Sequence, residues 1–160
     1  MSLLILIVIS LLPVQSRELD PGFYLTQEKS DDCQNLIRLS SRRRDFICLT
    51  PRPIISTEEF RAITEIQEDA EAHLYYADLS LSDEGVRVLK ALANSFRGST
   101  MVLILNNRLA GVLNYNESPF VRENQIRVSI PMLEGTLVDV HTQIKAVIAE
   151  NAKRTGGSGG

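Results

Sequence analysis

Residues 101–115, with the sequence MVLILNNRLAGVLNY, constrain the fold more than any other part of the chain. Two apolar runs flank the pair Asn106-Asn107, and asparagine tolerates the positive φ values that a type I′ hairpin turn requires. We therefore expect a β-hairpin with its turn at this pair. The predicted cross-strand pairs are Leu105 with Arg108, Ile104 with Leu109, Leu103 with Ala110 and Val102 with Gly111.

Both faces of this hairpin are apolar, so the alternation of residues does not identify a solvent side. The predicted faces are Leu103, Leu105, Ala110 and Val112 on one side and Val102, Ile104, Leu109 and Leu113 on the other. Helices expected at residues 82–97 and 136–154 cover one face. The other face is covered by the segment 23–49, or it serves as a partner surface. A glycine in a strand interior, here Gly111, is typical of a bulge or a close backbone approach.

A first helix is predicted after the run STEE at residues 56–59, which has the spacing of a capping box. In that motif the Ser56 hydroxyl accepts from the Glu59 amide, and the Glu59 side chain reaches back to Ser56. The helix is short and ends in a polar loop at residues 67–71. Its predicted apolar face consists of Phe60, Ile63 and Ile66.

Two further helices are predicted from their caps and apolar spacing. Ser82 caps the second helix, which ends at Gly98, and Thr136 opens the last one. The expected buried residues are Val86, Leu89, Ala93 and Phe96 in the second helix, and Leu137, Val140, Ile144, Val147 and Ile148 in the last.

The order of elements indicates the fold class. From His73 onward we expect strand, helix, strand, strand, strand and helix, and the strand at residues 126–130 alternates as a half-exposed strand does. Two short strands, at residues 23–25 and 46–49, precede this core. The pattern predicts an α+β fold, ferredoxin-like, in which the helices pack on one face of a mostly antiparallel sheet.

The N-terminal residues 1–16 have the apolar run and small-residue ending of a secretory signal peptide, with cleavage expected before Arg17. The run is shorter than the roughly 20 residues of a membrane-spanning helix. It lacks a preceding lysine or arginine, and the alternative is a buried N-terminal strand or helix. We expect an exported, periplasmic protein that meets the membrane only transiently, through this segment.

The remaining chain is expected to form one domain over residues 17–154. An N-terminal disulfide-tied segment covers 17–55, and the core covers 56–154. The final residues 155–160, TGGSGG, are typical of an engineered linker.

The chain has two cysteines, Cys33 and Cys48. In an exported protein such a pair predicts a disulfide, whereas two free buried thiols would be expected in a reducing compartment.

The sequence contains few side chains in arrangements typical of catalytic sites. His73 and His141 stand alone, with no second ligand at metal-binding spacing, and we expect His141 to be exposed. We therefore predict no enzyme activity, no metal site and no cofactor. A hydrolase would need a serine or cysteine within hydrogen-bonding distance of one of these histidines. The formal net charge of −3 argues against a nucleic-acid ligand.

Arginines are concentrated around residues 38–52, where they form a candidate partner-binding set for an acidic protein surface or anionic lipid headgroups. The alternative is a solvated loop, partly neutralised by neighbouring aspartates. The candidate partner-binding residues are Arg42, Arg43, Arg44, Arg52 and, on the hairpin, Arg108.

Residues 77–120 resemble the head subdomain in the first periplasmic region of SecD proteins, and the resemblance covers about residues 46–148. The run LSDEG at 81–85 is similar to the helix start of that subdomain, and LILNNRL at 103–109 to its apolar hairpin. The strand at 126–130 resembles the strand that follows. The resemblance implies a free-standing exported domain that contacts polypeptide and has no enzyme activity. The cysteine pair and the arginine run are not features of that family.

The expected function is therefore that of a non-enzymatic periplasmic module that binds a secreted or unfolded polypeptide, by addition to a sheet edge. The alternative is an exported immunity protein or inhibitor that covers the active site of a toxin or enzyme. Tight one-to-one binding would favour the alternative, and weak binding to many unfolded chains would favour the first hypothesis.

Overall fold

The computed structural model describes residues 18–28, 32–38, 46–71, 74–93, 100–114, 120–130 and 136–156. The predicted signal peptide lies outside the described residues, as do His73, Phe96 and Gly98. The described elements are β1 (Gly22–Gln27), β2 (Asn35–Arg38), β3 (Phe46–Leu49), β4 (Ile55–Ser56), the 3₁₀ turn η1 (Thr57–Glu59), β5 (Phe60–Ile63), β6 (Gln67–Asp69), β7 (Leu74–Leu81), α1 (Asp83–Ala93), β8 (Thr100–Leu105), β9 (Arg108–Asn114), β10 (Phe120–Arg122), β11 (Gln125–Ile130) and α2 (Thr136–Gly156).

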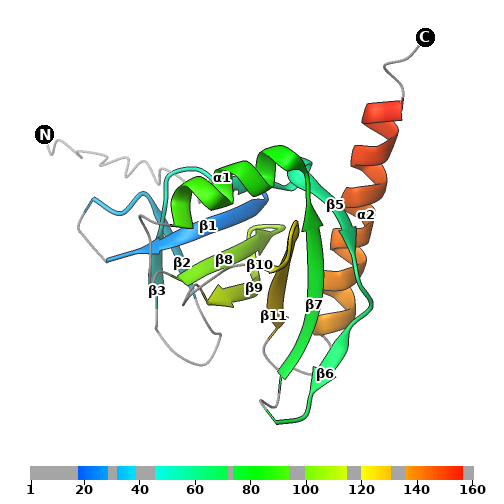
Figure 1. Ribbon diagram of the computed structural model, residues 1–160. Coiled ribbons are helices and arrows are strands. Elements are labelled where there is room, and N and C mark those ends of the chain that lie inside the picture. The colour runs from blue at the N-terminus through cyan, green and yellow to red at the C-terminus, as the bar shows by residue number, and fades with distance from the viewer. Residues whose placement is uncertain are drawn as a thin grey trace, which may run out of the picture.

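The strands form one sheet system with the order β2-β3-β1-β8-β9-β11-β7-β5. Three short strands lie off this path, where β4 pairs with β1, β6 with β7 and β10 with β11. The pairs between described strands are antiparallel. Figure 1 shows α1 across the top of the sheet and α2 along its right side. The predicted α+β class with an antiparallel sheet is confirmed.

The main core lies between one face of the sheet and the two helices. Val86 and Leu89 of α1, and Val140 and Ile144 of α2, belong to the same buried cluster as the sheet residues. The buried sheet residues of this cluster include Phe23, Leu25, Phe60, Leu79, Leu81, Met101, Leu103, Leu105, Leu113, Ile126 and Val128. Both helices therefore cover one face, as predicted.

The opposite face of β1, β8 and β9 has its own apolar cover. Val102 and Ile104 are buried there against Ile37 of β2 and Leu49 of β3. The predicted disulfide joins Cys33, just before β2, to Cys48 of β3, with a Cα–Cα distance of 5.8 Å. The prediction that the N-terminal segment covers the second face of the hairpin is thus confirmed, and the cover is cross-linked.

The Asn106-Asn107 turn has positive φ values of 48° and 60°, as a type I′ turn requires. The pairs nearest the turn form as predicted, but farther along Leu103 pairs with Gly111 and Val102 with Val112. The predicted pairing of these two residues was wrong by one position, because Ala110 is an extra residue at a bulge.

The bulge also exchanges two side chains between the faces. Leu113 is buried in the core under the helices, and Val112 packs on the opposite side with the β2–β3 cover. The predicted face assignments of these two residues were wrong, since an added residue reverses the alternation beyond it. The bulge lies next to Gly111, the glycine that indicated it.

The predicted helix after Ser56 is wrong. Only the single turn η1 forms, and Ser56 makes no side-chain cap hydrogen bond. The following residues form β5 and pair with β7, with Phe60 opposite Leu81. The predicted loop at 67–71 likewise contains β6. Local cap chemistry was outweighed by hydrogen bonding to a long neighbouring strand.

Glu59 instead serves the cap of α1. Its carboxylate accepts a hydrogen bond from the Ser82 hydroxyl, and the same hydroxyl accepts from the Gly85 amide at 3.1 Å. The prediction of Ser82 as a helix cap is confirmed. This contact joins η1 to the start of α1.

Candidate binding surfaces

The hairpin of β2 and β3 forms one end of the sheet path. The register places Leu36 opposite Cys48 and Arg38 opposite Phe46. Because side chains two apart share a face, Leu36 and Phe46 lie on the same outer side of this hairpin. Leu36 is 46% exposed and Phe46 is 42% exposed. The outer side of the β2–β3 hairpin therefore presents apolar surface next to β2, whose second edge has no strand partner within the described ranges.

Sequence reasoning missed β2. The feature of the sequence that could have indicated this strand is the apolar pair Leu36-Ile37, which is too short to show the alternation of a strand. The strand is held by Asn35, which is 3% exposed and donates from its side chain to the Thr50 carbonyl at 2.8 Å. It is held further by the ladder with β3 and by the disulfide. These long-range contacts are invisible in local sequence.

The face of the sheet that points away from the two helices is polar over β7 and β11. Asp78 pairs with Arg127 across the strands through two hydrogen bonds of 2.9 and 3.1 Å. The guanidinium of Arg127 also lies 3.8 Å from the ring centroid of Tyr76. Asp78 raises the pKa of Arg127, chiefly through this hydrogen bonding. These polar groups satisfy one another and need no cover.

The structure places the described candidate arginines apart. Arg52 is exposed in the connection between β3 and β4, and Arg108 is exposed just after the hairpin turn. Arg42, Arg43 and Arg44 lie outside the described residues. A single surface formed by the two described arginines is not present, since each lines a different cleft.

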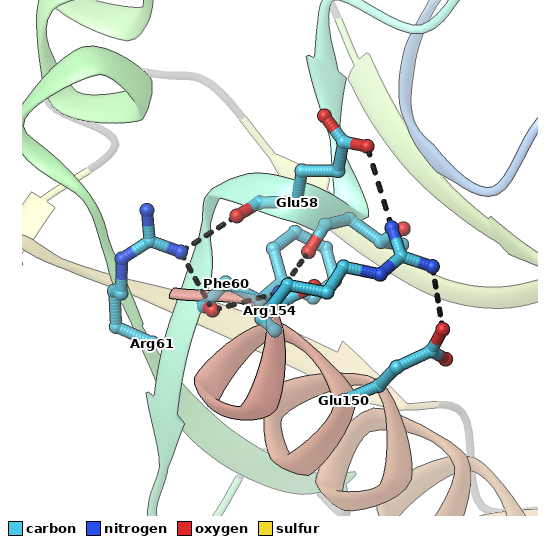
Figure 2. A network of polar contacts seen from close by, with 7 residues as sticks. Glu58, Phe60, Arg61, Glu150 and Arg154 are labelled. Carbon is cyan, nitrogen blue, oxygen red and sulfur yellow. Dashed lines mark hydrogen bonds and ion pairs between the residues drawn. The ribbon is translucent and has the colours of Figure 1, made fainter. Parts of the chain in front are cut away.

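Arg52 lines a cleft of about 540 Å³ between the start of β1 and the last turns of α2. Asp20, Ser56 and Thr57 line its sheet side, and Arg154 lines its helix side. Arg154 lies 2.5 Å from a Glu150 oxygen and 3.7 Å from a Glu58 oxygen. Figure 2 shows the Arg154 side chain reaching between these two carboxylates.

Arg108 lines a smaller cleft of about 290 Å³ with Asp139 and Gln143 of α2. The Asn106 amide donates to the Gln143 side chain at 2.8 Å and so holds the hairpin turn on the helix. This cleft lies along the contact between the β8–β9 hairpin and α2.

His141 is buried, not exposed as predicted. It is 7% exposed, and its Nε2 lies 2.9 Å from the Thr64 carbonyl oxygen. The residue lies on the side of α2 that contacts the segment after β5. The sequence predicts a helix where β5 forms, so this contact was not expected. Nearby, Lys145 of α2 contacts Glu65 at 2.6 Å, and this hydrogen bond lowers the pKa of Glu65.

Among the described residues, no group of three or more His, Cys, Asp or Glu side chains is placed to hold a metal ion. Within the same ranges, no helix is long and apolar enough to cross a bilayer. Cys48 is committed to the disulfide.

Comparison with known proteins places the fold. The chain matches no protein-family model and no curated protein sequence. It is similar to part of SecDF, in the crystal structure of the super-membrane-facing form, with a TM-score of 0.52 and 13% sequence identity. The match covers 81% of this chain and 18% of the SecDF chain. At this identity the likeness concerns the fold alone, and the fold is similar to that of a segment of SecDF.

Proposed function

We propose that the chain is an exported, non-enzymatic protein-binding module that resembles the SecD head subdomain. It acts by contact with another polypeptide in the periplasm. The observation that carries this proposal is the β2–β3 hairpin, in which β2 ends the sheet path without a further strand partner among the described residues, and which exposes the apolar side chains of Leu36 and Phe46.

An edge strand of this kind can accept an extended segment as an additional strand. Its free backbone N–H and C=O groups provide affinity, and the neighbouring side chains provide selectivity. Leu36 and Phe46 would contact alternate apolar residues of the incoming segment. Ile37 faces the opposite way and is 9% exposed, packed in the core. The strand can therefore stay packed on the sheet while its edge binds another segment.

The disulfide supports an exported location, because such bonds persist in oxidising compartments. The fold likeness to SecDF supports a domain related to translocation. The basic residues support an acidic or carbonyl-rich partner, with Arg42, Arg43, Arg44, Arg52 and Arg108 as proposed contacts.

The test is capture of partners by the purified protein from a periplasmic extract and, separately, of a reduced and carboxymethylated unfolded polypeptide. Leu36→Lys and Phe46→Lys should each weaken capture by about tenfold or more, since both place a charge on an apolar contact. Val138→Lys is the matched control, because Val138 is an exposed apolar residue on α2, 69% exposed.

Equal capture by all three variants would remove the edge from the proposal. A single stoichiometric partner bound in the nanomolar range, with no capture of the unfolded polypeptide, would instead support an immunity protein or inhibitor. Turnover of an ester, peptide or glycan by the purified protein would contradict the non-enzymatic assignment.

A further inference from the structure

A second candidate site lies in the Arg52 cleft, on the side of the molecule where α2 meets the start of β1. The cleft volume of about 540 Å³ falls within the range of sites for small ligands. β1 pairs with β3 at Thr26 and Gln27, but with β4 at Gly22 and Phe23, the end that adjoins this cleft. The cleft therefore lies at the opposite end of β1 from the β2–β3 hairpin.

The walls of the cleft are fixed by close packing. A side chain at Gly22 would place its Cβ 2.4 Å from the Ile55 carbonyl oxygen and 2.8 Å from the Pro53 Cβ. The glycine thus lets the segment before β4 lie directly on β1. Opposite, the Asn151 amide donates to the carbonyl oxygens of Thr57 at 2.8 Å and Phe60 at 3.2 Å. α2 is therefore attached to η1 along one side of the cleft.

A surface arginine network completes this attachment. In Figure 2, Arg154 bridges Glu58 and Glu150, while Arg61 lies on the far side of Phe60. The Arg61 guanidinium donates to the Glu58 carbonyl oxygen at 2.6 Å. The two glutamates and Arg154 are thus engaged with one another.

Several other polar groups of the cleft have no partner within the described residues. Thr57 is only 9% exposed, and neither its hydroxyl nor that of Ser56 makes a hydrogen bond there. The exposed guanidinium of Arg52 forms no ion pair among those residues. A hydroxyl that no described protein group satisfies is open to a hydrogen bond with a ligand in the cleft. All three groups can donate hydrogen bonds, and the guanidinium can only donate, so a ligand with acceptor oxygens matches them.

The cleft is lined by one more acidic than basic side chain, which disfavours a small anionic ligand. Three carboxylates, of Asp20, Glu58 and Glu150, line it together with two guanidiniums. Asp20 forms no ion pair within the described part of the chain. It is held beside Tyr24, whose hydroxyl donates to the Asp20 backbone carbonyl at 2.7 Å. A ligand with neutral carbonyl oxygens and one positive group matches both the free donors and the free carboxylate.

We propose that this cleft binds a short peptide segment that carries a basic side chain. The peptide carbonyl oxygens accept from the Thr57 and Ser56 hydroxyls and from Arg52, and the basic side chain pairs with Asp20. The inference rests on the proposed function in naming polypeptide as the ligand, but it uses a different surface. It gives the module a second contact that selects for a basic residue.

The test is a ¹⁵N NMR titration with an acetylated and amidated pentapeptide, four alanines around a central lysine. Its counterpart has glutamate at the centre. The lysine peptide should shift amide signals from residues 52–58 and 147–154, and the glutamate peptide should bind at least about tenfold more weakly. Thr57→Val and Asp20→Asn should each weaken lysine-peptide binding by about fivefold to tenfold.

Thr57→Val has a second readout that a merely structural hydroxyl would not give. Because the hydroxyl has no partner in the described part of the chain, its removal should leave the melting temperature unchanged or higher while binding falls. Arg87→Gln is the control, since Arg87 pairs with Glu84 on the exposed side of α1 and lies outside the cleft. It should bind the peptide normally.

The outcomes separate this inference from the proposed function. Absence of shifts with both peptides, or tighter binding of the glutamate peptide, would overturn the cleft assignment. If Leu36→Lys abolishes capture of unfolded polypeptide but leaves these shifts intact, the two surfaces are independent and both assignments hold. If the wild-type protein captures no polypeptide but shows the shifts, only the proposed edge fails.

Discussion

The face of the sheet that points away from the helices has two halves with opposite chemistry. Over β8 and β9 it is apolar, with Val102 and Ile104 buried beneath the β2–β3 hairpin. Over β7 and β11 it is polar, with the Asp78–Arg127 pair beside Tyr76. Because Ser129 of β11 lies opposite Val112 of β9 in register, the two halves are continuous.

The difference shows what a cover requires. The apolar half loses water only when another element lies on it, and the chain uses a hairpin with a cross-link for that purpose. The polar half is satisfied by pairs across its own strands and remains partly exposed. The cover brings a new strand edge with it, so the half that needs burial also provides the candidate binding edge.

The comparison predicts that a cavity in the apolar half has the largest effect on stability. Ile104 is fully buried, at 0% exposure. Ile104→Ala should lower the free energy of unfolding by about 2–5 kcal/mol, from lost apolar burial and the cavity left behind. Urea unfolding followed by circular dichroism measures this. Ser80→Ala in the polar half is the control, and an equal loss there would contradict the distinction.

Removal of the cross-link should have the next largest effect. Cys33 and Cys48 are 15 residues apart in sequence, and closure of such a loop contributes about 3 kcal/mol in the chain-entropy model. Cys33→Ser with Cys48→Ser should lower the free energy of unfolding by about that amount. Native-state hydrogen exchange would then show faster exchange in β2 and β3 than in β7 and β11. Uniform acceleration over all four strands would mean that the hairpin is not a separate cover.

Sequence alone predicted much of the fold where a segment carried its own signal. The Asn106-Asn107 turn, the Ser82 cap and the disulfide each depend on local chemistry or on a simple count of cysteines. The bulge position was indicated by Gly111, but the resulting register was not, because Ala110 has no property that marks an extra residue.

The predictions failed where pairing with a distant strand determines the local structure. The STEE run at 56–59 has every local feature of a helix start, yet the chain pairs with β7, which lies more than a dozen residues away. His141 was misplaced for the same reason, since its partner Thr64 follows that unexpected strand. The Arg52 cleft was equally hidden, because it is assembled from three segments that lie far apart in sequence.

A smaller effect is expected from the polar anchor of the cover. Asn35 is 3% exposed and donates to the Thr50 carbonyl. Asn35→Ala should lower the free energy of unfolding by about 1–3 kcal/mol, because the partly buried Thr50 carbonyl loses this hydrogen bond. The variant should also loosen β2 while leaving β7 unchanged, which amide exchange would detect. Asn151→Ala, which removes donors on the opposite side of the molecule, should leave β2 exchange unchanged.

The smallest effect is expected in the polar half itself. The Arg127 side chain is 41% exposed and that of Asp78 is 14% exposed, so solvent screens their attraction. A double-mutant cycle with Asp78→Ala and Arg127→Ala should give a coupling energy of no more than about 1 kcal/mol, and it should shrink further in high salt. A cycle with Tyr76→Leu and Arg127→Ala isolates the ring contact, which at a partly exposed site contributes about 0.5–1 kcal/mol. Coupling energies as large as the loss in Ile104→Ala would show that the polar half is stabilised as strongly as the covered one, and the comparison between the two halves would then fail.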